Sequence, residues 1–107
     1  MFTAKERQRY NEDRHRACDR LGITESQYNG FRREGAKLIK IWTDACNGDI
    51  TQEAMENIDE PIIKKVSARA RELRLFVYYQ TDPRGASIYL DTKAIPENNY
   101  TQAVCIY

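Results

Sequence analysis

Residues 75–91 read LFVYYQTDPRGASIYLD, and this stretch decides the fold. Residues 75–80 combine β-branched and aromatic side chains, which favour a strand, and residues 87–91 resemble them in composition. Between them, DPRG at residues 82–85 places Asp, Pro and Gly at the first, second and fourth positions of a type I turn. The sequence therefore predicts an antiparallel hairpin with strands at about 75–80 and 87–91. A last strand is expected at about 100–107.

The residues before this hairpin follow the three-to-four-residue periodicity of helices. Capping boxes start the first two helices at Thr3 and Thr24, and Gly22 supplies the left-handed position that ends the first one. Pro61 suits the first turn of a helix, so a short helical segment is expected before it and a separate helix after it. The expected helices are about 3–21, 24–46, 52–57 and 60–73.

Apolar side chains run along one face of the second helix, and they predict how the helices pack. The seam consists of Tyr28, Phe31, Leu38 and Trp42, and a second stripe that begins at Ile58 marks the inward side of the next helical region. Helices followed by a meander of strands predict an α+β fold with the helices on one sheet face. The chain has 107 residues, which is room for a single domain, residues 1–107. The oligomeric state is left open, because the seam can pack on the sheet or on a second copy in a homodimer.

Composition narrows the compartment and the class of partner. No apolar stretch approaches the ~20 residues that span a bilayer, and the first residues lack the apolar core of a secretion signal. We therefore expect a cytoplasmic protein without a membrane partner. Residues 1–40 carry ten basic and six acidic side chains, whereas the whole chain has a net charge of +1. This bias suits an acidic partner but is weaker than that of a committed nucleic-acid binder.

The sequence shows no constellation for catalysis, a metal or a cofactor, and we predict none of the three. His15, Cys18, Cys46 and Cys105 would complete a Cys₃His zinc set, but they lack the closely spaced ligand pairs typical of such sites. The three cysteines are therefore expected to be free thiols in a reducing compartment. His15 is the single imidazole and lies in the most highly charged helix, which is a poor place for a Cys-His nucleophile. No glycine-rich phosphate loop follows a strand.

Residues 18–33, CDRLGITESQYNGFRR, resemble the helix-turn-helix of phage and bacterial repressors. Cys18 takes the small position, Gly22 the turn, and Tyr28 and Phe31 the positions where that motif packs its second helix. The resemblance implies a DNA-binding regulator with its second helix in the major groove. An ordinary helical corner is the alternative, because this helix continues well beyond the motif. The residues implied to face the groove are Thr24, Ser26, Gln27, Asn29 and Arg32, with Arg33 near phosphate.

Three C-terminal segments carry a second resemblance. They are YQTDPRG at 79–85, IYL at 88–90 and IPENNYT at 95–101, taken together with LGIT at 21–24 and ACNG at 45–48. With them, most of the chain is similar to a family of small proteins encoded by tailed phages and prophages, which has no assigned activity. Such proteins often bind one host protein, including components of defence systems such as CRISPR effectors. The resemblance implies a non-enzymatic accessory protein that binds a host macromolecule stoichiometrically, for example to inhibit a defence complex.

The tyrosine-rich strands supply the residues predicted to bind that protein. Side chains alternate between the two faces of a strand, so some of these tyrosines must point away from the core. Tyrosine and arginine are frequent interface anchors. The alternative is that the tyrosines only cover a small sheet and that the arginine of the turn is solvated. The predicted anchors are Tyr79, Tyr89, Tyr100 and, at the tip of the turn, Arg84.

Overall fold

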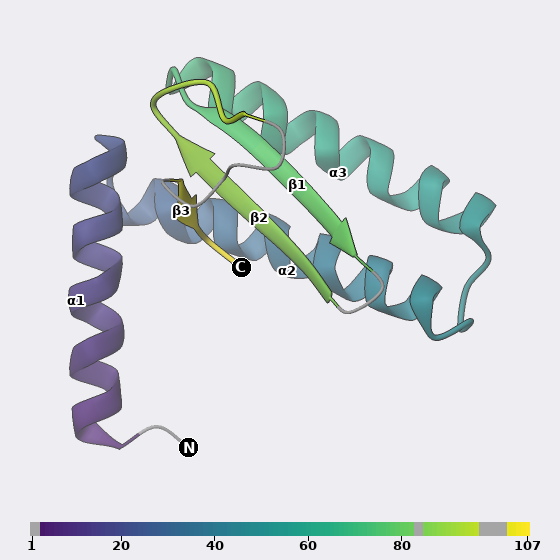
Figure 1. The fold of residues 1–107 in the computed structure, drawn as a ribbon, viewed down its shortest axis with the longest axis horizontal. Coiled ribbons are helices and arrows are strands. Elements are labelled where there is room, and N and C mark those ends of the chain that lie inside the picture. The colour runs from purple at the N-terminus through teal and green to yellow at the C-terminus, as the bar shows by residue number, and fades with distance from the viewer. Residues whose placement is uncertain (1–2, 83–84, 97–102) are drawn as a thin grey trace.

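The computed structural model describes residues 3–82, 85–96 and 103–107. Three helices, α1 (Ala4–Leu21), α2 (Glu25–Cys46) and α3 (Gln52–Glu72), precede the strands β1 (Phe76–Asp82), β2 (Gly85–Asp91) and β3 (Val104–Cys105). The strands form an antiparallel sheet in the order β1-β2-β3. Helices α2 and α3 lie against one face of this sheet, and α1 crosses one end of α2 (Figure 1). The predicted α+β fold is confirmed.

Local hydrogen bonds explain where α1 and α2 begin. The backbone N–H of Glu6 donates to Thr3 Oγ1 at 3.2 Å, and the Thr3 N–H donates to Glu6 Oε2 at 3.1 Å. Thr24 and Gln27 repeat this box at the start of α2, with distances of 3.1 and 2.9 Å. Gly22 has a φ of 68° and turns the chain between the two helices. Both predicted capping boxes are therefore confirmed.

Helix α3 is one continuous helix, and the predicted division into segments at 52–57 and 60–73 is wrong. It begins after Thr51, whose Oγ1 accepts the Ala54 N–H at 3.1 Å, and Pro61 lies inside it. A proline within a helix leaves the carbonyl four residues earlier without its N–H partner. Here that carbonyl belongs to Asn57, and both residues are exposed, so water can satisfy it.

The apolar seam of α2 forms the centre of the core. Tyr28, Phe31, Leu38 and Trp42 are each between 0 and 6% exposed, and they share one apolar cluster with Ile88 of β2. Gly35 permits this close packing, since a Cβ there would lie 3.2 Å from Ile88 Cδ1. The seam was expected to pack either on the sheet or on a second copy of the chain. In the structure it packs on the chain's own sheet.

The inward stripe of α3 differs from the prediction at its first position. Ile58 is 48% exposed, whereas its neighbour Asp59 is 8% exposed. The Asp59 carboxylate accepts a hydrogen bond of 2.9 Å from Trp42 Nε1–H across the α2–α3 interface. A buried indole N–H needs such an acceptor, so the polar residue faces inward and the apolar one faces water.

We expect Asp59→Ala to lower the free energy of unfolding by about 1–3 kcal/mol, because it leaves a buried donor without a partner. Ile58→Ala is the matched control, and its expected effect is within about 0.5 kcal/mol. Urea denaturation monitored by Trp42 fluorescence measures both changes. Equal losses for the two variants would contradict the observed orientation of α3.

The hairpin strands are longer than predicted, and the last strand is shorter within the described residues 103–107. The hairpin strands pair from Phe76 opposite Asp91 to Asp82 opposite Gly85. The last strand was expected at about 100–107, yet only Val104–Cys105 forms a strand among the residues described there. Ile106 continues the contact, since its N–H donates to Ile88 O at 2.9 Å and its side chain is 2% exposed.

Candidate functional site

The predicted anchor Tyr79 faces the helices. Its ring lies edge-on to Trp42 with centroids 6.1 Å apart, and its hydroxyl shares a hydrogen bond of 3.2 Å with Ser67. Burial raises the pKa of Tyr79, although the bond to Ser67 acts in the opposite direction. This tyrosine therefore packs beneath the sheet, between β1 and the helices.

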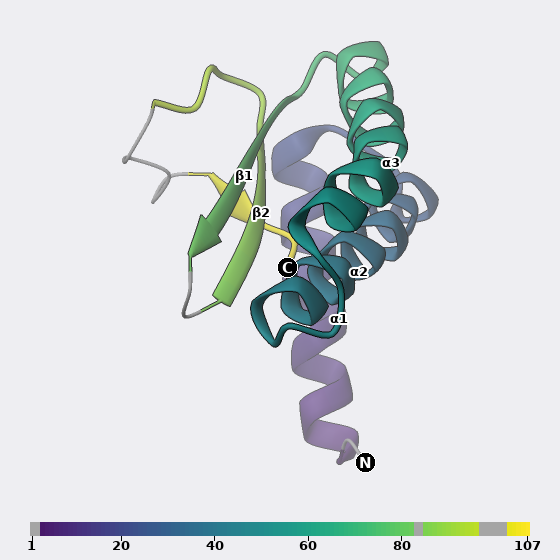
Figure 2. The ribbon, with the colours of Figure 1, turned by 90° about the vertical axis from the view of Figure 1, so that its right-hand side faces the viewer.

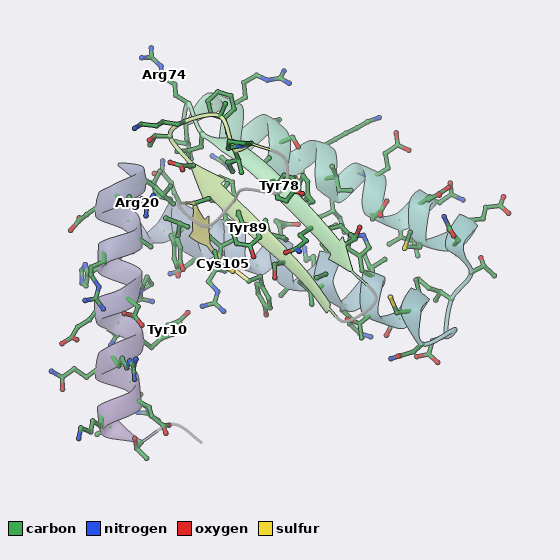
Figure 3. All side chains as sticks on the ribbon, viewed as in Figure 1. Tyr10, Arg20, Arg74, Tyr78, Tyr89 and Cys105 are labelled. Atoms are coloured by element: carbon green, nitrogen blue, oxygen red, sulfur yellow. The ribbon has the colours of Figure 1, made fainter. Side chains whose placement is uncertain are left out.

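The predicted anchor Tyr89 lies on the opposite face of the sheet, away from the helices. It stands beside its cross-strand partner Tyr78, with ring centroids 6.3 Å apart, and Cys105 of β3 follows on the same side (Figure 3). Both tyrosines are half-buried. The other two predicted anchors, Arg84 and Tyr100, lie outside the described residues.

Three of the six residues implied to contact DNA make contacts within the chain. The side chains of Thr24 and Gln27 belong to the capping box of α2. The Arg32 guanidinium lies 5.3 Å from the Tyr10 ring and 5.1 Å from the Tyr107 ring, and it donates to Tyr10 Oη at 2.5 Å. This cation–π contact joins α1, α2 and the C-terminus.

The other three residues, Ser26, Asn29 and Arg33, are exposed. Ser26 and Arg33 line a hollow of about 210 Å³ between α2 and α3. Glu34 lies in the same hollow, and burial by itself would raise the pKa of its carboxyl. Hydrogen bonds from Lys65 and Lys37, at 3.2 and 3.3 Å, outweigh burial and lower this pKa. The hollow therefore holds one carboxylate among the basic side chains of Arg33, Lys65 and Arg69.

The three cysteines differ in burial, and the histidine has an acidic neighbour. Cys18 is buried, and burial raises its pKa, whereas Cys46 and Cys105 are exposed. His15 Nε2 lies 3.1 Å from Glu25 Oε1. Across residues 3–82, 85–96 and 103–107, no group of three or more His, Cys, Asp or Glu side chains could hold a metal ion.

The junction between α3 and β1 has an unusual backbone. The Leu75 N–H donates to Ala70 O at 2.8 Å, and the Arg74 N–H donates to Arg71 O at 3.0 Å. These two bonds define a Schellman motif, whose left-handed position usually holds glycine. Arg74 occupies that position with a φ of 58°.

The other two helices end with the expected residue. Gly22 after α1 has a φ of 68°, and Gly48 after α2 has a φ of 79°. Arg74 is the one non-glycine residue with positive φ among the residues that the structure describes. A residue with a Cβ is disfavoured there by roughly 1–2 kcal/mol, so the side chain at position 74 calls for an explanation.

An exposed aromatic side chain lies directly beyond this junction. Phe76 is 49% exposed, the largest fraction for any large hydrophobic side chain in the described part of the chain. Arg71 and Arg74 are exposed as well, and neither forms an ion pair with any described residue. Figure 3 shows Arg74 pointing outward at this end of the sheet.

A third arginine stands at the same end. Asp91 lies opposite Phe76 in the ladder, and its carboxylate is 4.0 Å from Arg20 of α1. Because Arg20 is paired with Asp91, we call only Arg71, Arg74 and Phe76 the Phe76 corner. It combines an apolar centre with positive charge at its edges.

Sequence reasoning missed this corner. The change from helical to alternating periodicity at Leu75 indicated where α3 ends and β1 begins. Side chains alternate between the two faces of a strand, so an inward Leu75 would have predicted an outward Phe76. The left-handed backbone gave no signal, because position 74 lacks the glycine that normally marks it.

Comparison with protein-family models, with curated proteins and with solved structures found no match. Among the helices of the described residues, none has the length and apolar character that crossing a membrane requires.

Proposed function

We propose that the protein is a non-enzymatic accessory protein that docks stoichiometrically on another protein through the Phe76 corner. The observation that carries this proposal is Arg74, whose left-handed backbone would be less strained with glycine. Its side chain makes no ion pair within the described chain. A costly side chain that forms no ion pair or hydrogen bond with the described residues supports a role in binding.

The chemistry of the corner suits a protein partner. A half-exposed Phe76 can enter an apolar pocket, and guanidinium groups around it can pair with carboxylates. The resemblance to phage-encoded proteins makes a protein of the bacterial cytoplasm the expected partner, with a defence complex as the leading target. The DNA-binding alternative has less support, because Thr24, Gln27 and Arg32 already contact their own chain.

The test is an affinity pull-down from bacterial host lysate, with and without nuclease. We expect Phe76→Ala and Arg71→Glu to lose a protein that the unaltered chain retains. Ile58→Ala is the matched control, because Ile58 is 48% exposed and Phe76 49%, and Ile58 lies on α3 away from the corner. This control should retain the partner.

Two results would overturn the proposal. Equal retention by all four proteins would place the binding surface elsewhere. Loss of the partner after nuclease treatment would instead favour the helix-turn-helix interpretation, in which binding also weakens steeply with salt.

A further inference from the structure

Among the described residues, no strand pairs with the outer edge of β1. The Ile106 N–H donates to Ile88 O, so the backbone of Ile88 faces β3. Tyr79 is the register partner of Ile88, so its N–H and C=O point the other way, toward the outer edge of β1. The same alternation brings the backbone groups of Val77 and Thr81 to this edge.

The sequence of β1 lacks two residue types that commonly protect an edge strand against pairing. β1 is the terminal strand of the sheet, and FVYYQTD over Phe76–Asp82 contains neither lysine nor proline. Within the described ranges, no backbone hydrogen bond joins Val77, Tyr79 or Thr81 to a segment beyond this edge. In Figure 1 the edge runs on the side of the sheet where α3 lies.

A hollow adjoins the edge where β1 begins. It has a volume of about 490 Å³ and lies between the last turns of α3 and the start of β1. Ala70, Phe76 and Val77 give it apolar walls, and Arg71 and Arg74 also line it. In Figure 2 the strands lie to the left of α3, and the chain passes from the end of α3 into β1 at the top of the view.

We propose that the edge of β1 accepts an extended acidic segment of the partner protein as a further strand of the sheet. Main-chain hydrogen bonds to Val77, Tyr79 and Thr81 hold the segment in register. Alternate apolar side chains enter the hollow, and the intervening carboxylates reach Arg71 and Arg74. This inference rests on the proposed function and names the chemistry that the Phe76 corner recognises.

Charge favours such a segment over a second copy of the chain. Two arginines at the rim of the hollow attract a strand rich in carboxylates, whereas β1 itself carries one carboxylate, Asp82. Nucleic acid offers phosphates to the arginines but no peptide groups to the strand edge.

The probe for this site is a fluorescent peptide of about eight residues in which valine and glutamate alternate. Fluorescence anisotropy should show that it binds the full chain. Arg71→Ala and Arg74→Gly should weaken binding by more than about tenfold, and a peptide with lysine in place of glutamate should not bind. Amide hydrogen exchange of Val77, Tyr79 and Thr81 should slow when the acidic peptide is present.

N-methylation of the peptide separates strand addition from simple charge attraction. Successive N–H groups of an added strand point alternately toward β1 and away from it. Methylation at one alternate set of positions should abolish binding, and methylation at the other set should leave it unchanged. Strand addition would be overturned by equal effects of the two sets or by failure of the acidic peptide to bind. It would also be overturned if light scattering showed that the chain self-associates and that this accounts for the slower amide exchange.

The two proposals fail in different ways. If the peptide does not bind but the pull-down still depends on Phe76, strand addition is wrong and the proposed function stands. If the peptide binds at the edge of β1 and no partner depends on Phe76, the proposed function is wrong.

Discussion

Leu38→Ala should lower the free energy of unfolding by about 2–5 kcal/mol, the usual cost of removing a fully buried leucine from a core. Leu38 is 0% exposed and belongs to the same buried cluster as Ile88 and Leu90, which are also 0% exposed. Its removal leaves a cavity in the cluster that joins α2 to the sheet. A small domain has a free energy of unfolding of only about 5–15 kcal/mol, so this substitution removes a large share of it.

Urea denaturation at several protein concentrations measures this effect and its origin. The loss should be independent of concentration, because the seam of α2 packs on the chain's own sheet. Ile58→Ala, which removes a half-exposed side chain of α3, should cost far less. A loss below about 1 kcal/mol for Leu38→Ala, or a loss that grows on dilution, would contradict the observed core.

The parts of the fold that depend on local interactions could be predicted from the sequence. Thr3 and Thr24 each bond to a residue three positions later, so the sequence itself contains both partners of each capping box. The hairpin is local in the same sense, because a short turn sets the register of its strands. The spacing along α2 predicted the buried seam, since one helix face must leave water.

Features that depend on distant partners could not be predicted in the same way. Asp59 is buried because Trp42, on another helix, needs an acceptor for its indole N–H. Ile58 is displaced to the surface as a consequence. Pro61 can continue α3 because Asn57, whose carbonyl loses its N–H partner, is an exposed residue, and sequence spacing alone does not show that exposure.

The candidate site was harder to predict than the fold. Tyrosines on strands indicated a docking surface, but residue type does not say which face each one takes. Tyr79 packs beneath the sheet, and Tyr89 stands on the other face. The Phe76 corner depends on the left-handed backbone at Arg74. Its φ is like those of Gly22 and Gly48, but no glycine marks the position in the sequence.

Arg74→Gly should weaken partner binding by more than about tenfold without lowering the stability of the fold. Glycine is the usual residue at this backbone position, so relief of strain offsets the greater entropy of the unfolded chain. The expected change in unfolding free energy is between zero and a gain of about 1 kcal/mol.

The matched control is the reverse substitution, glycine to arginine, at the position that follows α1. Gly22 occupies the same motif with a φ of 68°, and a Cβ built there meets no atom within 4 Å. Gly22→Arg therefore adds the backbone strain without a steric clash, and it should cost roughly 1–2 kcal/mol while leaving partner binding unchanged.

The most direct test measures two quantities for the unaltered chain and for Arg74→Gly. They are the affinity for the captured partner and the urea concentration at the midpoint of unfolding. The account predicts that affinity falls while the urea midpoint stays equal or rises. Unchanged affinity would show that Arg74 does not bind the partner, and a fall in affinity accompanied by a lower midpoint would show that Arg74 serves the fold.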